Sequence, residues 1–311
     1  MRTIEKIPLL VITGPTAAGK TALALELAAH RDIEIISADS RQVYRHMDIG
    51  TAKASVQERA EVTHHCIDIV DVDEPFSVSA FSEIAHAAIE DIHRRGRLPV
   101  VVGGTGLYIR ALTWGLAPLP GADEALRRKW HALEKEEKGS LHTRLTKVDP
   151  KLAKGLHTND ITRIIRALEV HSLTGKTMSS WQQEHRFAER PYFALKLAVT
   201  CERSHLYRRI EERVELMLAQ GLMDEVRALL QRGYNPELKA MRTIGYQQSA
   251  AYLRGELSFA QAIEEIKRDT RRYAKRQLTW LRHDNEINWL ECPLDSGSIV
   301  EWADQLLCRC R

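Results

Sequence analysis

The sequence is poor in cysteine, and its cysteines are not arranged for a disulfide framework or a zinc site. The five cysteines, at positions 66, 201, 292, 308 and 310, are odd in number, and no two of them are separated by two residues. Disulfide-stapled domains carry even sets of cysteines, and structural zinc sites use closely spaced pairs. We therefore expect free thiols in a reducing compartment.

Long hydrophobic runs are also missing. No apolar run approaches the roughly 18 residues of a membrane-spanning helix. The first residues lead directly into an apolar segment, without the order of regions typical of a signal peptide. We therefore expect a cytoplasmic protein without a membrane part, and we expect it to be a monomer.

Neither sign of charge dominates. The net charge of +3 over 311 residues permits nucleic-acid binding without requiring it, so the placement of the basic residues has to decide. A hydrophobic content of 44% and a charged content of 28% are ordinary for a globular protein with one large or two modest domains.

A phosphate-binding pattern lies near the N-terminus. The apolar segment 9–13 leads into a glycine-rich turn, and a strong helix-forming segment follows. The pattern G-x-x-x-x-G-K-[ST] in this context favours a phosphate loop over an ordinary strand–turn–helix corner. Backbone N–H groups, the positive end of the helix and a lysine would hold the phosphate, and a hydroxyl would bind Mg²⁺. The loop residues are Gly14, Pro15, Thr16, Ala17, Ala18, Gly19, Lys20 and Thr21, with Thr21 as the magnesium ligand.

Hydrophobic periodicity predicts an α/β fold with a doubly wound parallel sheet. Apolar runs at 9–13, 34–37, 99–102 and 194–200 read as strands, and helical patterns lie at 20–30, 77–95 and 105–113. A P-loop-type core would comprise residues 1–118 and 191–311, with a small helical insertion at 119–190 and C-terminal helices after it. Inside the insertion we expect helices at 124–138, 140–145, 150–156 and 160–173, the last capped by Asn159. Further helices are expected at 206–219, 223–231 and 259–283.

Polar residues follow two of the predicted strands. Asp39 comes after the second strand, where it could be a catalytic carboxylate, a helix N-cap or a magnesium ligand. Thr105 is the only side chain in the turn 103–106 that can form hydrogen bonds, and no acidic residue of the kind found in motor ATPases lies there. His64, His65 and Cys66 lack partner ligands at zinc spacing, so we interpret these histidines as structural or as supports of a nearby site rather than as metal ligands.

The predicted helix 259–283 carries many basic residues. Arg268, Arg272, Lys275 and Arg282 form a stripe, with Arg271 and Arg276 beside it and Tyr273 and Trp280 interleaved. This pattern fits contact with an RNA backbone, although a solvated helix face is the alternative. The pair Arg163 and Arg166 reads by default as a solvated face.

Six segments in one order carry a resemblance. They are 14–21 (GPTAAGKT), 37–44 (SADSRQVY), 50–53 (GTAK), 103–108 (GGTGLY), 241–246 (MRTIGY) and 275–282 (KRQLTWLR). Together they resemble bacterial tRNA dimethylallyltransferases, also called tRNA isopentenyltransferases, over residues 9–283. The resemblance implies transfer of a dimethylallyl group from dimethylallyl diphosphate to N6 of the adenosine on the 3′ side of the anticodon. The tRNAs would be those that read codons beginning with U.

The resemblance also implies roles for individual residues. Asp39 would remove a proton from the amine, Thr105 would help to position it, and Arg213 would hold the diphosphate beside Mg²⁺ on Thr21. The insertion would grip the anticodon stem-loop. The tRNA contacts that it implies are Asp39, Ser40, Arg41, Gln42, Thr105, Arg127, Arg163, Ile164, Ile165, Arg166, Ala167, Arg242, Thr243, Ile244, Gly245, Tyr246, Gln247, Lys275, Arg276, Gln277, Leu278, Thr279, Trp280, Leu281 and Arg282.

Other functions remain open. A P-loop small-molecule kinase would use the same loop, but it has no need of a long basic helix. A non-catalytic RNA-binding ATPase-like module would leave Asp39 and Thr105 without a role. An adenylate isopentenyltransferase acting on free nucleotide would not need the insertion or the basic stripe.

Overall fold

A parallel β-sheet organises the larger of two units. The computed structural model describes residues 6–186, 188–292 and 297–310. In these residues a sheet of six strands has the order β3-β2-β4-β1-β5-β6, and every neighbouring pair is parallel. The strands are β1 (Pro8–Thr13), β2 (Ile33–Ser37), β3 (His64–His65), β4 (Leu98–Val102), β5 (Phe193–Thr200) and β6 (Ile287–Glu291). The predicted α/β class and the four predicted strands are confirmed.

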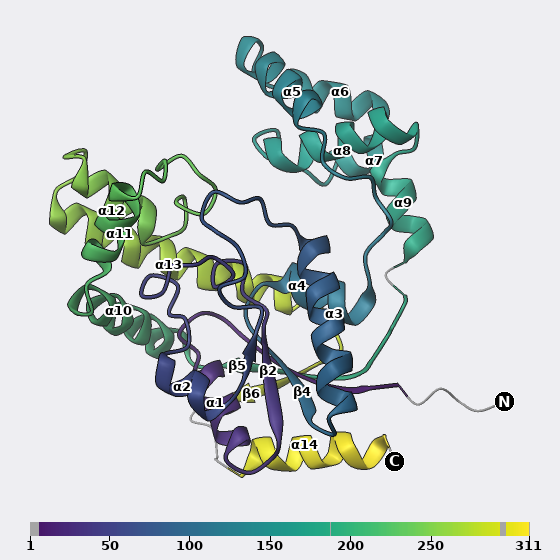
Figure 1. Cartoon of the computed structure of the whole chain (residues 1–311). Coiled ribbons are helices and arrows are strands. Elements are labelled where there is room, and N and C mark those ends of the chain that lie inside the picture. The colour runs from purple at the N-terminus through teal and green to yellow at the C-terminus, as the bar shows by residue number, and fades with distance from the viewer. Residues whose placement is uncertain (1–5, 187, 293–296, 311) are drawn as a thin grey trace. The chain divides into compact units, whose positions relative to one another are not determined.

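Side chains on alternate positions of the strands face opposite layers. Leu9 and Val11 of β1 belong to a core shared with α3 (Val78–Arg94), and Leu10 and Ile12 to a core shared with α1 (Lys20–Ala28) and α14 (Ser298–Arg309). Figure 1 shows α1 and α3 on opposite sides of the sheet. Because both faces are covered, the central strands read in the sequence as continuous apolar runs.

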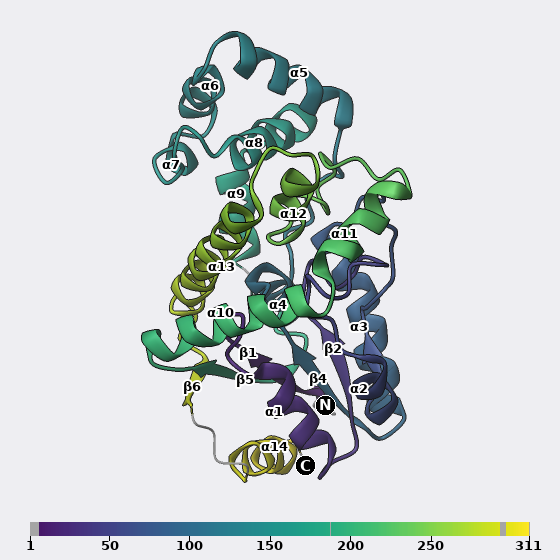
Figure 2. The same cartoon turned by 90° about the vertical axis from the view of Figure 1, so that its left-hand side faces the viewer.

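Further described helices of this unit include one after β2, one after β4 and four after β5. They are α2 (Val56–Glu61), α4 (Gly106–Trp114), α10 (Arg203–Ala219), α11 (Leu222–Gln231), α12 (Tyr246–Leu253) and α13 (Phe259–Leu281). Helices α10 and α13 pack side by side (Figures 1 and 2). A capping box between Ser258 and Gln261 fixes the start of α13.

Some elements are missing from the sequence-based prediction. β3 has two residues, and α2, α9 and α12 are short, so each has too little periodicity to be recognised. β6 and α14 lie in the tail after Asp284, where no motif draws attention to them. The tail nevertheless contributes Ile299, Ala303 and Leu306 to the core around β1.

A second unit consists of residues 114–190. Its helices are α5 (Glu124–Glu136), α6 (Ser140–Val148), α7 (Pro150–Ala153), α8 (Ile161–Thr174) and α9 (Met178–His185). Leu141, Leu145 and Leu168 belong to its own hydrophobic core. The unit begins at Trp114 rather than at the predicted residue 119. The predicted cap Asn159 is wrong, because Asp160 is the N-cap and accepts a hydrogen bond from the Arg163 N–H.

A buried carboxylate lies on β2 of the sheet. The Glu34 side chain is 1% exposed, and it accepts hydrogen bonds from Arg95 and from Arg97 at 2.7 Å. The ring of His65 lies 2.7 Å from the same carboxylate. Hydrogen bonding from Arg95, joined by His65 and Arg97, outweighs burial and lowers the pKa of Glu34 to about 2.

This cluster predicts a pH dependence of stability. Because the folded pKa lies below the ordinary value of 4.5, Glu34 stabilises the fold above about pH 4.5, and the contribution is lost as the pH falls toward 2. Glu34→Gln should lower the free energy of unfolding at pH 7 by about 3 kcal/mol, since it leaves a network of cations without its anion. Urea unfolding at pH 7 and pH 4 measures the free energy of unfolding of both proteins. The difference between variant and wild type should be smaller at pH 4 than at pH 7. A gap of constant size would contradict this role.

Candidate active site

A cavity of about 240 Å³ lies where β1, β2 and β4 end. Ends of parallel strands are where ligands bind in doubly wound sheets. Its walls come from the phosphate loop, from segments after β2 and β4, and from α10 and α13. The lining residues are Thr16, Ala17, Gly19, Lys20, Thr21, Asp39, Gln42, Thr51, Ala52, Val102, Gly103, Gly104, Arg209, Arg213, Tyr273 and Gln277.

The phosphate loop has the geometry that its sequence predicts. Gly14 has a φ of 141°, and a Cβ atom there would lie 2.5 Å from the carbonyl oxygen of Val199 on β5. Gly19 has a φ of 100° and immediately precedes α1, which starts at Lys20. The Lys20 ammonium group donates to the carbonyl oxygens of Gly14 at 3.1 Å and Pro15 at 2.8 Å. The turn therefore holds its lysine inside the loop, at the positive end of the helix.

One amide of the phosphate loop is bonded to a side chain of α13. The N–H of Thr16 donates to Oε1 of Gln277 on α13 at 2.9 Å. The Thr16 N–H is therefore engaged with a protein group in this structure, and the amides of the following loop residues are the better candidates for contact with a phosphate.

Three cations face the cavity. Burial and, to a smaller extent, the charge of Arg213 lower the pKa of Lys20 to about 8, against the opposing charge of Asp39. Burial also lowers the pKa of Arg213, with Asp39 opposing and Arg209 adding to the effect. Asp39 is the one carboxylate among the described lining residues, so the cavity favours a ligand with several negative charges.

Arg209 is a site residue that the sequence prediction missed. It lies four residues before Arg213 on α10, so both side chains project from the same face of the helix. Its guanidinium group approaches Gly19, where a Cβ atom would lie 3.3 Å from one of its nitrogens. The spacing of the two arginines was a signal that could have identified it.

Asp39 and Thr105 lie near each other because the segment after β2 is hydrogen-bonded to the turn after β4. The N–H of Thr105 donates to the carbonyl of Ala38 at 3.1 Å, and the Thr105 hydroxyl accepts from the N–H of Ser40 at 3.1 Å. Oδ1 of Asp39 accepts from the N–H of Arg41 at 2.8 Å. Burial and the charge of Asp39 raise the pKa of Tyr273, which lines the same cavity, to about 12. The tyrosine is therefore a neutral hydroxyl at physiological pH.

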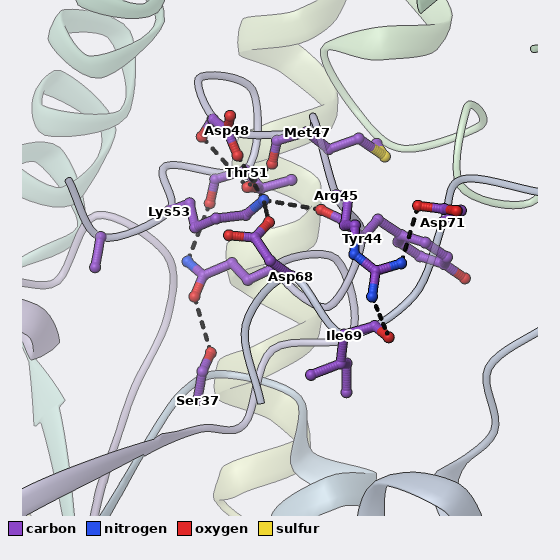
Figure 3. A network of polar contacts seen from close by, with 12 residues as sticks. Ser37, Tyr44, Arg45, Met47, Asp48, Thr51, Lys53, Asp68, Ile69 and Asp71 are labelled. Carbon is purple, nitrogen blue, oxygen red and sulfur yellow. Dashed lines mark hydrogen bonds and ion pairs between the residues drawn. The ribbon is translucent and has the colours of Figure 1, made fainter. Parts of the chain in front are cut away.

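A polar network supports the part of the cavity wall formed by Gln42, Thr51 and Ala52 (Figure 3). Nε2 of Gln42 donates to the carbonyls of Thr51 at 3.3 Å and Ala52 at 3.1 Å, and its Oε1 accepts from Ser37. The buried ammonium of Lys53 donates to Asp48 and Asp68. The amide of Gln42 is thus engaged with protein groups, and the predicted base contact would require these bonds to be exchanged.

Lys53 and its carboxylate partners hold the same loop in place. The Lys53 ammonium also donates to the carbonyl of Tyr44 at 2.8 Å. Burial would raise the pKa of Asp68, but hydrogen bonds from Lys53 and Arg59 lower it. The segment 50–53 of the family resemblance is therefore a structural support of the cavity.

Glu225 on α11 fixes the same loop from outside. Its carboxylate accepts from the N–H groups of Asp48, Ile49 and Gly50, at 2.9, 2.8 and 3.1 Å, and from the Tyr246 hydroxyl. A Cβ atom on Gly50 would lie 2.4 Å from the Tyr246 ring, which explains the glycine. Tyr246 is fully buried, so the predicted RNA contact of its side chain is wrong.

The predicted RNA-binding residues divide into exposed and buried groups. Arg163, Arg242, Gln247, Lys275, Arg276, Thr279 and Arg282 are exposed, and Ser40, Arg41, Thr105, Arg127, Arg166, Ile244, Leu278 and Trp280 are partly exposed. Thr243, Gly245, Tyr246, Gln277, Leu281, Ile164, Ile165 and Ala167 are buried. For Ile164, Ile165, Ala167, Tyr246 and Leu281, helical spacing turns the side chain toward the interior of its unit, which contradicts a surface contact by that side chain. Thr243 and Gly245 precede α12, and Gln277 faces the cavity.

The basic stripe of α13 is partly neutralised. Arg268 and Arg272 pair with Asp269, and Arg271 pairs with Glu211. For Lys275 and Arg282, no ion pair is formed with another described residue. These two cations are thus the better candidates for an anionic partner.

In the second unit, two predicted RNA-binding arginines share one buried carboxylate. Arg127 and Arg166 both donate to Glu169, whose side chain is 0% exposed, and Arg166 also donates to the carbonyl of Pro120. Burial would raise the pKa of Glu169, but the hydrogen bonds from the two arginines lower it. Arg163 differs, because its side chain is 74% exposed.

The histidines near β3 have structural partners. His64 hydrogen-bonds to the carbonyl of Val62 and His65 pairs with Glu34. Over the described ranges, no three His, Cys, Asp or Glu side chains gather in a way that could hold a metal ion. No described helix is long and apolar enough to cross a membrane.

Comparison with protein families decides the relationship. The family model described as IPP transferase matches residues 42–284, and that described as isopentenyl transferase matches residues 7–74. The chain belongs to the IPP transferase family. This IPP transferase is 53% identical over 306 residues to tRNA dimethylallyltransferase 2 of Syntrophus aciditrophicus, covering 98% of both chains. It is 54% identical over 304 residues to tRNA dimethylallyltransferase of Geobacter metallireducens, covering 96% of this chain and 97% of the relative.

Solved structures agree with the P-loop-type fold of this IPP transferase. The full-length tRNA isopentenylpyrophosphate transferase of Bacillus halodurans aligns with a TM-score of 0.73 at 40% identity, covering 98% of each chain. A eukaryotic dimethylallyltransferase acting on tRNA aligns with a TM-score of 0.82 at 30% identity. That alignment covers 97% of this chain and 79% of the other.

The titration of Lys20 predicts how anion binding depends on pH. Since the pKa of Lys20 is about 8, its positive charge is present below pH 8 and is lost above it. Calorimetric affinity for inorganic diphosphate should therefore fall between pH 7 and pH 9 in the wild type, relative to Lys20→Met. Comparison with the variant removes the titration of the ligand itself. An equal pH dependence in both proteins would contradict a role for this ammonium group.

Proposed function

We propose that this IPP transferase moves a dimethylallyl group from dimethylallyl diphosphate to N6 of the adenosine on the 3′ side of the anticodon. The tRNAs would be those that read codons beginning with U, and the second product would be diphosphate. One observation carries the proposal: a carboxylate and three cations line one small cavity. Its similarity to tRNA dimethylallyltransferases, at more than half identical residues, supports it.

The cationic wall suits the leaving group. As the allylic C–O bond breaks, negative charge develops on the diphosphate, and fixed positive groups lower the energy of that state. Lys20, Arg209 and Arg213 supply the charge, and the loop amides beyond Thr16 supply further donors. An arginine can bind two phosphate oxygens at once in a way that lysine cannot.

Thr21 fits a magnesium ion bound together with diphosphate. It lies in the first turn of α1, lines the cavity and has an exposed side chain. Mg²⁺ usually takes one or two protein ligands and completes its shell with phosphate oxygens and water, so a single hydroxyl suffices. When bound, the ion neutralises charge on the leaving diphosphate.

Asp39 is the proposed general base. The lone pair of an adenine amine is delocalised into the ring, so the amine becomes a competent nucleophile only as its proton is removed. Asp39 accepts that proton while the new C–N bond forms. Thr105, held beside Ser40, orients the amine.

The RNA would enter with its adenine extruded from the loop. A base inside a stacked anticodon loop must leave the stack to reach a carboxylate in a cavity. The exposed cations Lys275 and Arg282 on α13 would contact the backbone, and residues 119–190 would contact the anticodon stem-loop. We propose that the protein acts as a cytoplasmic monomer.

A direct test uses an anticodon stem-loop RNA incubated with the protein, Mg²⁺ and dimethylallyl diphosphate. Mass spectrometry should find a gain of one isoprene unit on the RNA. Parallel reactions with AMP as acceptor and with ATP as donor test the adenylate isopentenyltransferase and the kinase. Modification of AMP but not of the RNA, or phosphate transfer from ATP, would refute the proposal.

Removal of the carboxylate should stop chemistry without stopping binding. Asp39→Asn should reduce kcat by about 10²–10⁴-fold, the usual contribution of a general base. Affinity for the stem-loop should change little. Asp73→Asn, at an exposed position, is the matched control and should keep full activity. Wild-type turnover by Asp39→Asn would remove this residue from the mechanism.

Neutralising the exposed cations of α13 should weaken RNA binding and its salt dependence. In Lys275→Ala/Arg282→Ala, the slope of log affinity against log salt should become shallower by about 1 to 2 units. Filter binding at four or more salt concentrations measures this slope. Arg94→Ala/Arg309→Ala, on α3 and α14, removes the same charge elsewhere. Equal slopes for the two double variants would contradict a specific contact by α13.

A further inference from the structure

One buried carboxamide connects two parts of the cavity wall that are far apart in the sequence. Gln277 lies on α13 and is 7% exposed. Its Oε1 accepts from the N–H of Thr16 in the phosphate loop at 2.9 Å, and its Nε2 donates to the carbonyl of Gly104 at 2.9 Å. It is thus bonded to the diphosphate side and to the Thr105 side of the cavity at once.

The glycines of the turn after β4 are shaped by the same helix. A Cβ atom on Gly104 would lie 2.1 Å from Nε2 of Gln277. A Cβ atom on Gly106 would lie 2.2 Å from the ring of Trp280, three residues further along α13. Only glycine allows α13 to approach so closely at both positions, so the turn is built to receive this face of the helix.

The chemistry of the contact suits a carboxamide. Thr16 presents a donor and Gly104 presents an acceptor, so the bridging group must accept on one side and donate on the other. A glutamine side chain does both with a planar group of fixed geometry. A buried backbone donor or acceptor left without its partner would cost about 1–3 kcal/mol.

We propose that Gln277 is a positioning residue that sets the phosphate loop relative to the turn carrying Thr105. By accepting from the Thr16 N–H, it removes this amide from the loop amides that can donate to the ligand. The same bond fixes the loop in the form that binds diphosphate. By holding the turn as well, it keeps the leaving-group site in register with Asp39 and Thr105. Its effect on kinetics rests on the proposed function, whereas its effect on the loop and on diphosphate does not.

Two variants separate the two hydrogen bonds. Gln277→Met has a similar volume and loses both the acceptor and the donor. Gln277→Glu keeps the acceptor for Thr16, loses the donor to Gly104 and adds negative charge beside the diphosphate. Gln231→Glu, exposed at the end of α11, is the control for the added charge.

Amide hydrogen exchange reads the loop directly. Exchange at the Thr16 N–H, followed by NMR, should be about tenfold faster or more in Gln277→Met and near the wild-type rate in Gln277→Glu. Calorimetry with inorganic diphosphate and MgCl₂ should show about tenfold weaker binding in Gln277→Met and still weaker binding in Gln277→Glu. Gln231→Glu should match the wild type in both measurements.

Kinetics test the connection to the turn. With dimethylallyl diphosphate and the stem-loop RNA, both Gln277 variants should show a higher KM for the diphosphate substrate and a lower kcat. The KM for RNA should stay unchanged. General loss of structure would not raise the KM for the diphosphate substrate while leaving the KM for RNA unchanged. If the wild type transfers no alkyl group while the exchange and calorimetry give the expected pattern, the proposed function fails and the role of Gln277 stands.

Two results would overturn the inference. One is wild-type exchange of the Thr16 amide in Gln277→Met. The other is wild-type affinity for inorganic diphosphate in both Gln277 variants. If Gln277→Met does not fold, the Thr16 amide of Gln277→Glu decides, because fast exchange there, despite the retained acceptor, would overturn the inference.

Discussion

The site depends on the attachment of two neighbouring strand ends to each other. Past the last residues of β2 and β4, the chain continues the sheet pairing through Ala38, whose N–H bonds Val102 and whose carbonyl accepts from Thr105. Gly103 makes this possible, because a Cβ atom there would lie 2.2 Å from the Ala38 oxygen. The positions of Asp39 and Thr105 therefore follow from backbone hydrogen bonds rather than from flexible side chains. A catalytic group placed this way loses little freedom when substrate arrives.

Helices that follow much later in the chain hold the neighbouring parts of the cavity wall in place. Glu225 holds the loop at 48–50, and Lys53 holds it from within, so that Thr51 and Ala52 keep their place in the wall. Arg209 and Arg213 reach the cavity from α10. The small cavity is thus surrounded by elements whose mutual packing forms only when the whole larger unit has folded. Its electrostatic character, three cations around one carboxylate, is a property of that packing.

Local patterns in the sequence were sufficient for the elements that carry strong signals. The phosphate loop, Asp39 at the end of β2 and the turn with Thr105 were all predicted, because each lies directly after a buried apolar strand. Contacts between distant segments were not predictable in the same way. Nothing local to Gln277 indicates that its amide bonds Thr16, and nothing local to Glu225 indicates that it caps a loop more than a hundred residues earlier. The two-residue β3 and the tail elements β6 and α14 had too little periodicity. Assigning RNA contacts to whole motif segments also included buried residues, because one side of a helix packs against the core. Ile164, Ile165 and Tyr246 lie on such a side.

The C-terminal helix α14 has a practical consequence for how this enzyme can be shortened. All six segments of the family resemblance end by residue 282, so a fragment cut after that point would keep every functional signature. Such a fragment would nevertheless uncover Leu10, Ile12 and Leu23, against which α14 packs. The apolar surface laid bare belongs to β1 and α1, the elements on either side of the phosphate loop. Truncation at the far end of the chain would thus damage anion binding near its beginning, through loss of core packing rather than of any ligand-contacting group.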